Sequence, residues 1–127
     1  MNVGGRKISE ILSLFLLKSG IRLTTSSDKE VVRELKEKHC LISSKESYKS
    51  LTSTLPDGQN IQITAEALRL PEMLFYPERY GLECESLLQQ IQKSLEHCDL
   101  HAKQKLLDNV IVVGGNTLTK GIWFFIE

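Results

Sequence analysis

The chain has 127 residues, enough for one small domain, and its 16 Lys and Arg residues balance its 16 Asp and Glu residues. A net charge of zero argues against direct nucleic-acid binding and against an acidic interaction tail. The scattered cysteines Cys40, Cys84 and Cys98 form no disulfide framework or zinc motif, so they favour a reducing compartment.

An apolar run near the start, residues 8–17, follows the basic pair Arg6 and Lys7 and resembles a secretory signal. Glu10 and Ser13 interrupt the run, and no small-residue cleavage site follows it. The run is also too short to cross a bilayer. We therefore predict neither secretion nor a membrane partner.

Two helices are predicted in the first third of the chain. Apolar residues at helical spacing indicate the first, over residues 7–19, and Gly20 suits its left-handed C-terminal cap. The second, over residues 28–40, follows Ser27, which with Glu30 has the spacing of a capping box. A short strand is predicted to begin at residues 40–42.

A β-hairpin is predicted next. The Ser- and Lys-rich residues 43–53 are typical of a mobile loop. The turn L-P-D-G-Q at residues 55–59 combines a proline that presets one backbone angle with a glycine that permits a positive one. Ile61 and Ile63 alternate with polar residues, which indicates a strand leaving the turn.

The second half of the chain is predicted to be mainly helical. We expect a short helix over residues 71–75, a loop over 77–81, and helices over 85–98 and 101–107. The β-branched run at residues 110–113 is typical of a buried strand. Gly114 and Gly115 end this strand, and no repeat or linker divides the chain into two domains.

Two groups of residues are candidate ligand contacts. Gly114 and Gly115 could let a ligand approach the backbone at the end of a strand, although a plain tight turn is the simpler explanation. Arg33, Lys36 and Glu37 share one helix face and could hold a ribose or an adenine edge. A solvated face with one ion pair is the simpler explanation of that spacing.

No catalytic or metal site is predicted. His39, His97 and His101 come with no carboxylate motif, and the Cys98–Asp99 step is expected to break the helix between the last two. The sequence has no phosphate-binding loop of the P-loop type, no G-x-G-x-x-G motif and no Ser/His/Asp pattern.

Five segments, in this order and with this spacing, resemble the actin family. They are V-G-G-R at 3–6, K-E-V-V-R-E-L-K-E-K-H-C at 29–40, L-P-D-G-Q at 55–59, P-E-M-L-F-Y-P at 71–77 and N-V-I-V-V-G-G-N-T-L at 109–118. Each segment is unspecific alone, but together they define a match that runs from about Val3 to Gly121, nearly the whole chain. Their divergence is typical of an actin-related or actin-like protein.

The resemblance implies an α/β fold, namely part of an actin-like ATPase lobe of the ribonuclease H-like type with helices, short strands and a hairpin. The chain would then be one partial domain over residues 1–127. Residues 122–127, which include Trp123 and Phe124, depart from the family and suggest a truncated product such as an alternative transcript. No evident helix holds this apolar tail, and the partner lobe of the family is absent, so we expect exposed apolar surface and expect deletion of residues 123–127 to improve the behaviour of the chain.

The resemblance also implies a nucleotide site. The matching positions that line the adenosine side of an ATP cleft are Gly5, Arg33, Lys36, Glu37, Gly114, Gly115 and Thr119. Thr119 stands where the family usually has an aromatic ring, and Val113 replaces a serine, so ATP or ADP binding is expected to be weak. The family's phosphate loops, metal-handling Asp and water-positioning Gln and His do not occur, so we expect no ATPase activity.

The implied function is a non-catalytic cytoskeletal or assembly component of the cytoplasm, with other actin-family or cytoskeletal proteins as partners. One alternative is an actin-related subunit of a nuclear chromatin-remodelling complex. Another is half of an ATP-binding cleft that a second chain completes. Residues 76–84 match the family's filament plug, but Glu78 and Arg79 make it more charged, so self-polymerisation is expected to be weak.

Overall fold

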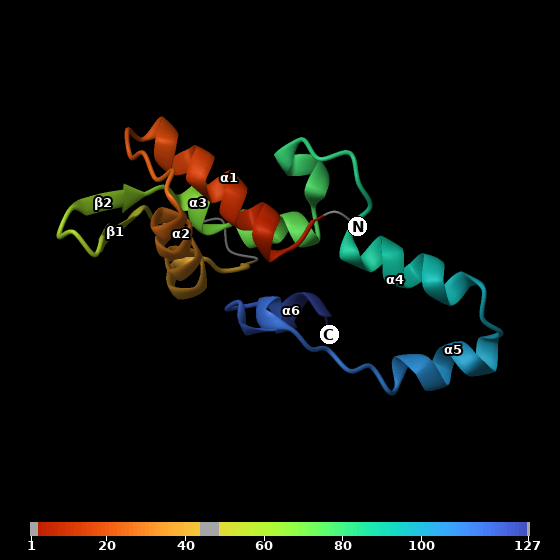
Figure 1. Ribbon diagram of the computed structural model, residues 1–127. Helices are drawn as coiled ribbons and strands as arrows, with labels where there is room; N and C mark the ends of the chain where they lie inside the picture. The colour runs from red at the N-terminus through yellow and green to blue at the C-terminus, as the bar shows by residue number, and fades with distance from the viewer. Residues whose placement is uncertain (1–2, 44–48, 127) are drawn as a thin grey trace.

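The computed structural model describes residues 3–43 and 49–126 (Figure 1). It contains a helical body with one small sheet, and an extended arm made by two helices in the second half of the chain. The elements in chain order are α1 (Gly5–Lys18), α2 (Ser26–His39), β1 (Leu51–Thr54), β2 (Asn60–Ile63), α3 (Ala65–Leu68), the 3-10 helices η1 (Leu70–Leu74) and η2 (Pro77–Tyr80), α4 (Leu87–Glu96), α5 (Leu100–Leu107), the 3-10 helix η3 (Gly115–Leu118) and α6 (Trp123–Ile126).

Helix α1 buries the stripe that its sequence predicts. Ile8, Leu12 and Leu16 are each at most 2% exposed. Gly20 adopts φ +84°, and the N–H of Ile21 donates to the carbonyl of Leu16 at 2.9 Å, which closes the helix with a left-handed cap. The predicted cap at Gly20 is confirmed.

Helix α2 begins two residues earlier than predicted. Thr25, not Ser27, is the cap: its hydroxyl accepts from the N–H of Asp28, and the Asp28 carboxylate accepts from the N–H of Thr25 at 2.8 Å. Asp28 takes the place in the capping box that was predicted for Glu30, and Thr25 with Asp28 has the same three-residue spacing as Ser27 with Glu30. Glu30 instead forms an ion pair with Arg33.

The hairpin is confirmed, and its first strand lies in the segment predicted to be a loop. β1 and β2 pair antiparallel, with Ser53 opposite Ile61, so β1 occupies residues 51–54. Residues 44–48 of the predicted loop lie outside the described residues. In place of the strand predicted at residues 40–42, the described chain has a single parallel bridge, between Leu41 and Lys120.

The core lies between α1, α2, the sheet and η1. Figure 1 shows α1 and α2 packed beside the hairpin, with α3 between them. Besides the stripe of α1, buried apolar side chains come from α2, β2, α3 and η1: Val32, Leu35, Ile61, Ile63, Ala67, Leu68, Leu70, Met73 and Leu74. The buried carboxylate of Glu72 lies in this region. It accepts two hydrogen bonds from the guanidinium of Arg69, at 2.7 and 2.9 Å. The predicted helix at 71–75 is a 3-10 helix, and the predicted loop at 77–81 is the further 3-10 turn η2.

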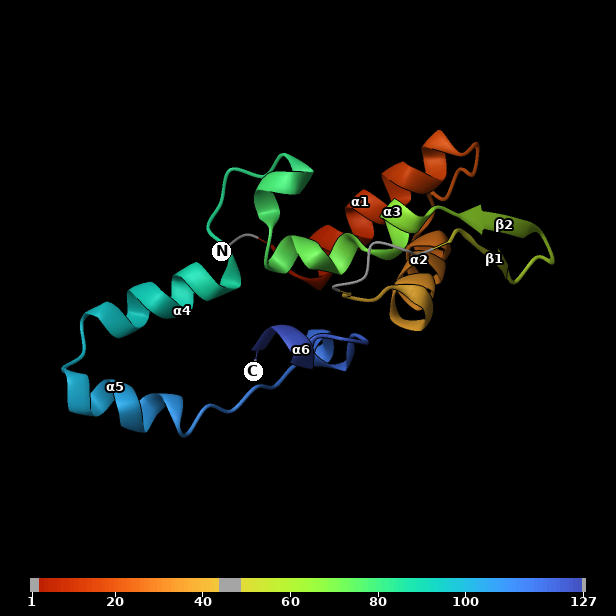
Figure 2. The same ribbon diagram turned by 180° about the vertical axis from the view of Figure 1, so that it is seen from behind.

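Helices α4 and α5 form an arm that extends away from this core (Figures 1 and 2). Both helices occur close to where they are predicted, and Asp99 caps α5, which separates His97 from His101. Neither helix contains a buried residue. Among the described residues, no helix is long and apolar enough to span a membrane.

The strand predicted at residues 110–113 is not formed. The segment pairs with no strand among the described residues, and Ile111 and Val113 are 85% and 81% exposed. A β-branched run becomes a buried strand only where neighbouring strands receive it, and the described sheet consists of β1 and β2 alone. The prediction of a buried strand was therefore wrong for this chain.

The C-terminal segment returns to the core. Ile122 is 3% exposed, and Phe125 packs against Phe75 with ring centroids 5.1 Å apart. We expected no element to hold this apolar tail, but α6 places half of it on the body. Trp123 and Phe124 remain exposed.

Candidate functional site

Three chain segments meet at the start of α1. The Nζ of Lys36 in α2 donates to the carbonyl of Gly5 at 3.2 Å. A Cβ added at Gly5 would lie 2.9 Å from Oδ1 of Asn116 and 3.3 Å from Nζ of Lys36. Gly5, Lys36 and Asn116 thus form one polar cluster, and a side chain at position 5 would require the ends of the other two side chains to shift.

The N-terminus of α1 supplies free donors to this cluster. Its N-cap is Gly4, and no side chain caps the first turn, which also holds no acidic residue. The first N–H groups of a helix have no partner within the helix and carry partial positive charge. The cluster therefore offers backbone N–H groups, an ammonium and an amide to a polar ligand.

The segment that carries Asn116 is fixed by its connection to the end of α2. The N–H of Ile42 donates to the carbonyl of Lys120 at 2.8 Å, and Nζ of Lys120 lies 3.4 Å from the carbonyl of Lys38. Gly121 has φ +85°, and a Cβ there would lie 1.9 Å from the carbonyl oxygen of Ile42. The glycine permits this close approach, which positions η3 beside α1 and α2.

Arg33 and Glu37 lie on the exposed side of α2. Arg33 pairs with Glu30 and, at 3.8 Å, with Glu37, and all of these side chains are more than half exposed. This geometry is that of a solvated face, the simpler explanation left open by the spacing. A ligand role for Arg33 and Glu37 stays a prediction.

The remaining predicted residues lie near η3. Gly114 has φ +115° and is exposed, as is Gly115, while Thr119 is half-buried and donates its N–H to the carbonyl of Asn116 at 3.1 Å. The structure thus brings Gly5 and Lys36 together with the residue after Gly115. Sequence reasoning missed Asn116, although its place directly after the glycine pair was a usable signal.

Burial shifts the pKa of two side chains at the end of α2. Desolvation, with the nearby cations Lys38 and Lys120, lowers the pKa of His39, whose Nε2 lies 3.0 Å from Oγ of Ser53. Burial raises the pKa of the Cys40 thiol to about 12, which makes it an unreactive core residue. The described residues contain no cluster of His, Cys, Asp and Glu suited to a metal ion.

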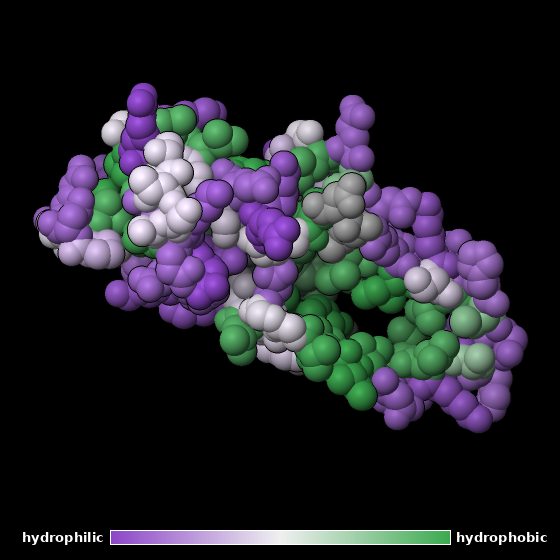
Figure 3. Space-filling view, viewed as in Figure 1, coloured by the Kyte–Doolittle hydropathy of each residue, from purple (hydrophilic) through white to green (hydrophobic). Residues whose placement is uncertain are grey.

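A second feature is an apolar groove between α4 and α5. It has a volume of about 410 Å³ and is lined mainly by Leu87, Ile91, Leu95, Leu106, Leu107 and Val110. Figure 3 shows the hydrophobic side chains gathered along the inner side of the arm, around a hollow. We call this surface, together with the exposed Ile111 and Val113, the α4–α5 face.

Comparison with known proteins gives the class to which this lobe belongs. The family model for actin matches residues 4–123. The chain therefore belongs to the actin family, as the five segments and the mixed helix-and-hairpin lobe indicated.

Relatives of known name are centractins and an actin-like protein. The chain is 38% identical to centractin of Schizosaccharomyces pombe over 129 residues, which cover 94% of this chain and 34% of that protein. It is 37% identical to the actin-like protein of Neurospora crassa, with 95% and 35% covered, and 38% identical to centractin of Saccharomyces cerevisiae, with 95% and 35% covered. The chain thus spans about a third of the length of these relatives.

Proposed function

We propose that this chain is a non-catalytic component of an actin-type assembly, in which its α4–α5 face packs against another actin-family polypeptide. The observation that carries the proposal is the exposure of that face. Five of its apolar side chains are 50% to 85% exposed, namely Leu106, Leu107, Val110, Ile111 and Val113. A contiguous apolar surface of this kind marks a contact site.

The chemistry of the face supports a polypeptide as the occupant. The helices offer an unfilled seam of branched aliphatic side chains, and residues 110–113 offer an extended backbone. No backbone hydrogen bond joins residues 110–113 to another described residue. An extended segment with free N–H and C=O groups is completed by a neighbouring strand, which only a polypeptide supplies.

The non-catalytic part of the proposal rests on the polar cluster. Lys36 contacts a backbone carbonyl and Arg33 pairs with glutamates, and the nearest described side-chain atoms to an added Cβ at Gly5 belong to Asn116 and Lys36, not to a carboxylate that could orient water or a metal ion. Phosphoryl transfer requires positioning of the attacking water and neutralisation of charge on the phosphate. The cluster offers donors without either device, so we expect no ATP hydrolysis.

Residual adenine-nucleotide binding is the second part of the proposal. The uncapped start of α1, Lys36 and Asn116 could contact one side of a nucleotide. We expect a Kd for ATP or ADP weaker than about 1 mM, about −4 kcal/mol, because only one wall of the site is present.

We place the chain among cytoskeletal proteins of the cytoplasm, as its resemblance implies.

Binding to a purified actin-family protein tests the proposed function. Sedimentation velocity of the chain with centractin of Schizosaccharomyces pombe should show a complex. Ile111→Asp should weaken it at least tenfold, because a buried carboxylate without a partner is costly. Leu14→Asp is the matched control, since Leu14 is 57% exposed on α1, away from the face. Equal binding by both variants, or no complex with the unmodified chain, would contradict the proposal.

Calorimetry with ATP tests the nucleotide part separately. Titration should show weak heat that Lys36→Ala removes, with no phosphate released above a heat-treated control. A micromolar Kd, about −8 kcal/mol, would show that the site is more complete than proposed. Phosphate release by the native chain would overturn the non-catalytic assignment.

A further inference from the structure

The outer edge of β2 carries backbone groups with no partner. The N–H of Leu55 donates to the carbonyl of Gln59 at 2.8 Å, and the register places Ser53 opposite Ile61. Since bonded and non-bonded pairs alternate along an antiparallel ladder, Ser53 and Ile61 form the next bonded pair. Asn60 and Gln62 therefore direct their N–H and C=O groups away from β1, and no described residue bonds to those groups.

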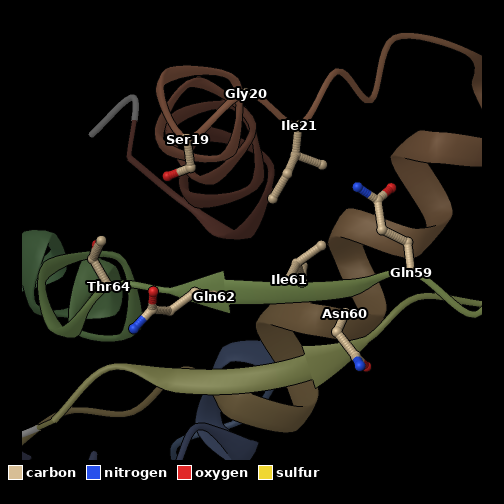
Figure 4. Close-up of a pocket in the computed structure, with 8 residues that line it drawn as sticks. All are labelled: Ser19, Gly20, Ile21, Gln59, Asn60, Ile61, Gln62 and Thr64. Atoms are coloured by element: carbon tan, nitrogen blue, oxygen red, sulfur yellow. The ribbon is translucent and has the colours of Figure 1, made fainter.

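This edge opens onto a pocket rather than onto another element. The pocket, of about 290 Å³, is lined by residues 59–62 and Thr64 on one side and residues 19–21 on the other. Successive side chains of a strand alternate between its faces, so four consecutive residues can line one pocket only along the strand's edge. Figure 4 shows Ile21 and Ile61 directed toward one another across this space.

Nothing in the two strands protects the edge against pairing. Residues 51–54 and 60–63 contain no charged residue and no proline, which are the usual means of blunting an edge strand. On the opposite wall, a Cβ added at Gly20 would meet nothing within 4 Å, so this part of the pocket is open space.

The chemistry of the walls selects the occupant. The lining side chains are amides, hydroxyls and isoleucines, with no charged group among them. A charged ligand would lose its hydration without a counter-charge, whereas peptide groups would find both donors and acceptors along β2. The pairing groups of Asn60 and Gln62 are two residues apart, which is the repeat of an extended chain.

We propose that the outer edge of β2, at Asn60 and Gln62, binds an uncharged segment of another protein in extended conformation, which adds a third strand to the hairpin between β2 and the end of α1. The added strand forms main-chain hydrogen bonds with Asn60 and Gln62, and residues 19–21 form the far wall. This edge is distinct from the α4–α5 face, so either surface can fail its test without the other.

A capped, uncharged peptide of alternating threonine and valine is the probe for this edge. Hydrogen exchange of the full chain should show that the peptide protects the amides of Asn60 and Gln62 and leaves those of Thr52 and Thr54 unchanged. The same peptide with N-methyl groups along one edge should give no protection, because it cannot pair. This readout needs no variant of the protein.

Two proline variants provide a matched pair. Gln62→Pro removes an outward N–H of β2 and should weaken peptide binding at least about tenfold. Thr52→Pro removes the outward N–H of the residue directly opposite, on the other edge of the hairpin, and should leave peptide binding unchanged. Absence of peptide binding, or binding without protection of Asn60 and Gln62, would overturn the proposal. Protection that rises with protein concentration alone would assign the edge to a second copy of this chain, and would overturn the proposed occupant.

Discussion

Gly121 is the residue at which backbone conformation and close packing coincide. Its φ of +85° already disfavours any side chain, and a Cβ would lie 1.9 Å from the carbonyl oxygen of Ile42. We predict that Gly121→Ala lowers the free energy of unfolding by more than about 2 kcal/mol, because the Ile42–Lys120 hydrogen bond must shift as well. Chemical denaturation measures this loss.

Gly58 is the matched control for this prediction. It has φ +86°, but nothing lies within 4 Å of an added Cβ. Gly58→Ala should therefore carry only the cost of the left-handed conformation, about 1–2 kcal/mol. Equal losses for the two variants would show that the contact between Gly121 and Ile42 does not constrain the fold.

His39 gives the fold a defined pH dependence. Its pKa in the folded chain is lowered from the ordinary value of 6.5, because burial and the cations Lys38 and Lys120 oppose a second positive charge. As pH falls below about 6.5, the unfolded chain binds the proton first, so the free energy of unfolding falls until pH passes the folded pKa.

The variant His39→Gln should remove the loss in the free energy of unfolding that occurs as pH falls just below 6.5. The parent chain, measured in the same buffers, is the comparison. Denaturation midpoints collected across this range decide the matter. A stability that rises on acidification would reverse the sign and contradict the assignment.

At the scale of elements, α6 contributes through one side of its single turn. Phe125 contacts Phe75 and Tyr76, with ring centroids 5.1 and 6.2 Å apart, whereas Phe124 is 87% exposed. We predict that Phe125→Ala lowers the free energy of unfolding by about 2–3 kcal/mol and that Phe124→Ala changes it by less than about 0.5 kcal/mol. Thermal unfolding of the pair measures the difference.

The C-terminal turn therefore bears on the effect of a deletion. The sequence alone suggested that removing residues 123–127 would improve the behaviour of the chain, because the tail has no evident element to hold it. Since Phe125 packs on the body, the deletion should instead lose about as much stability as Phe125→Ala. A deletion variant that melts higher than the parent would support the original expectation.

Local signals predicted some elements and could not predict others. Helix α1, its cap at Gly20 and the hairpin turn depend on neighbours in sequence, so periodicity and turn chemistry were sufficient. The cap of α2 was misplaced because Thr25 and Ser27 are both good caps, and the choice depends on where Asp28 points. Residues 110–113 failed because a strand depends on partners distant in sequence.

At the scale of the whole molecule, some features of the candidate site could be predicted from the sequence and others could not. Gly5 came from the family resemblance, whereas Lys36 was already a candidate from its place on the helix face, and the structure brings them into one cluster with Asn116. Spacing alone favoured an ion-paired, solvated face for Arg33 and Glu37, and their geometry is of that kind. The α4–α5 face was expected only as generally exposed apolar surface, because its location requires the path of the chain.

The α4–α5 face is the feature that makes this chain an assembly component in our account. The body has a buried apolar core between α1, α2, the sheet and η1, so it folds around its own contacts. The helices of the arm contain no buried residue, and apolar side chains from both of them line the groove. The stability of the arm should therefore depend on its partner more than that of the body.

Hydrogen exchange at residues 110–113 tests this account most directly. In the isolated chain at low concentration, these amides should exchange freely, since no described residue bonds to them. Addition of centractin from Schizosaccharomyces pombe should protect them, while the amides of α1 keep the protection that they already have. Strong protection of residues 110–113 in the isolated chain, or free exchange within a formed complex, would contradict the assignment of the α4–α5 face as the assembly surface.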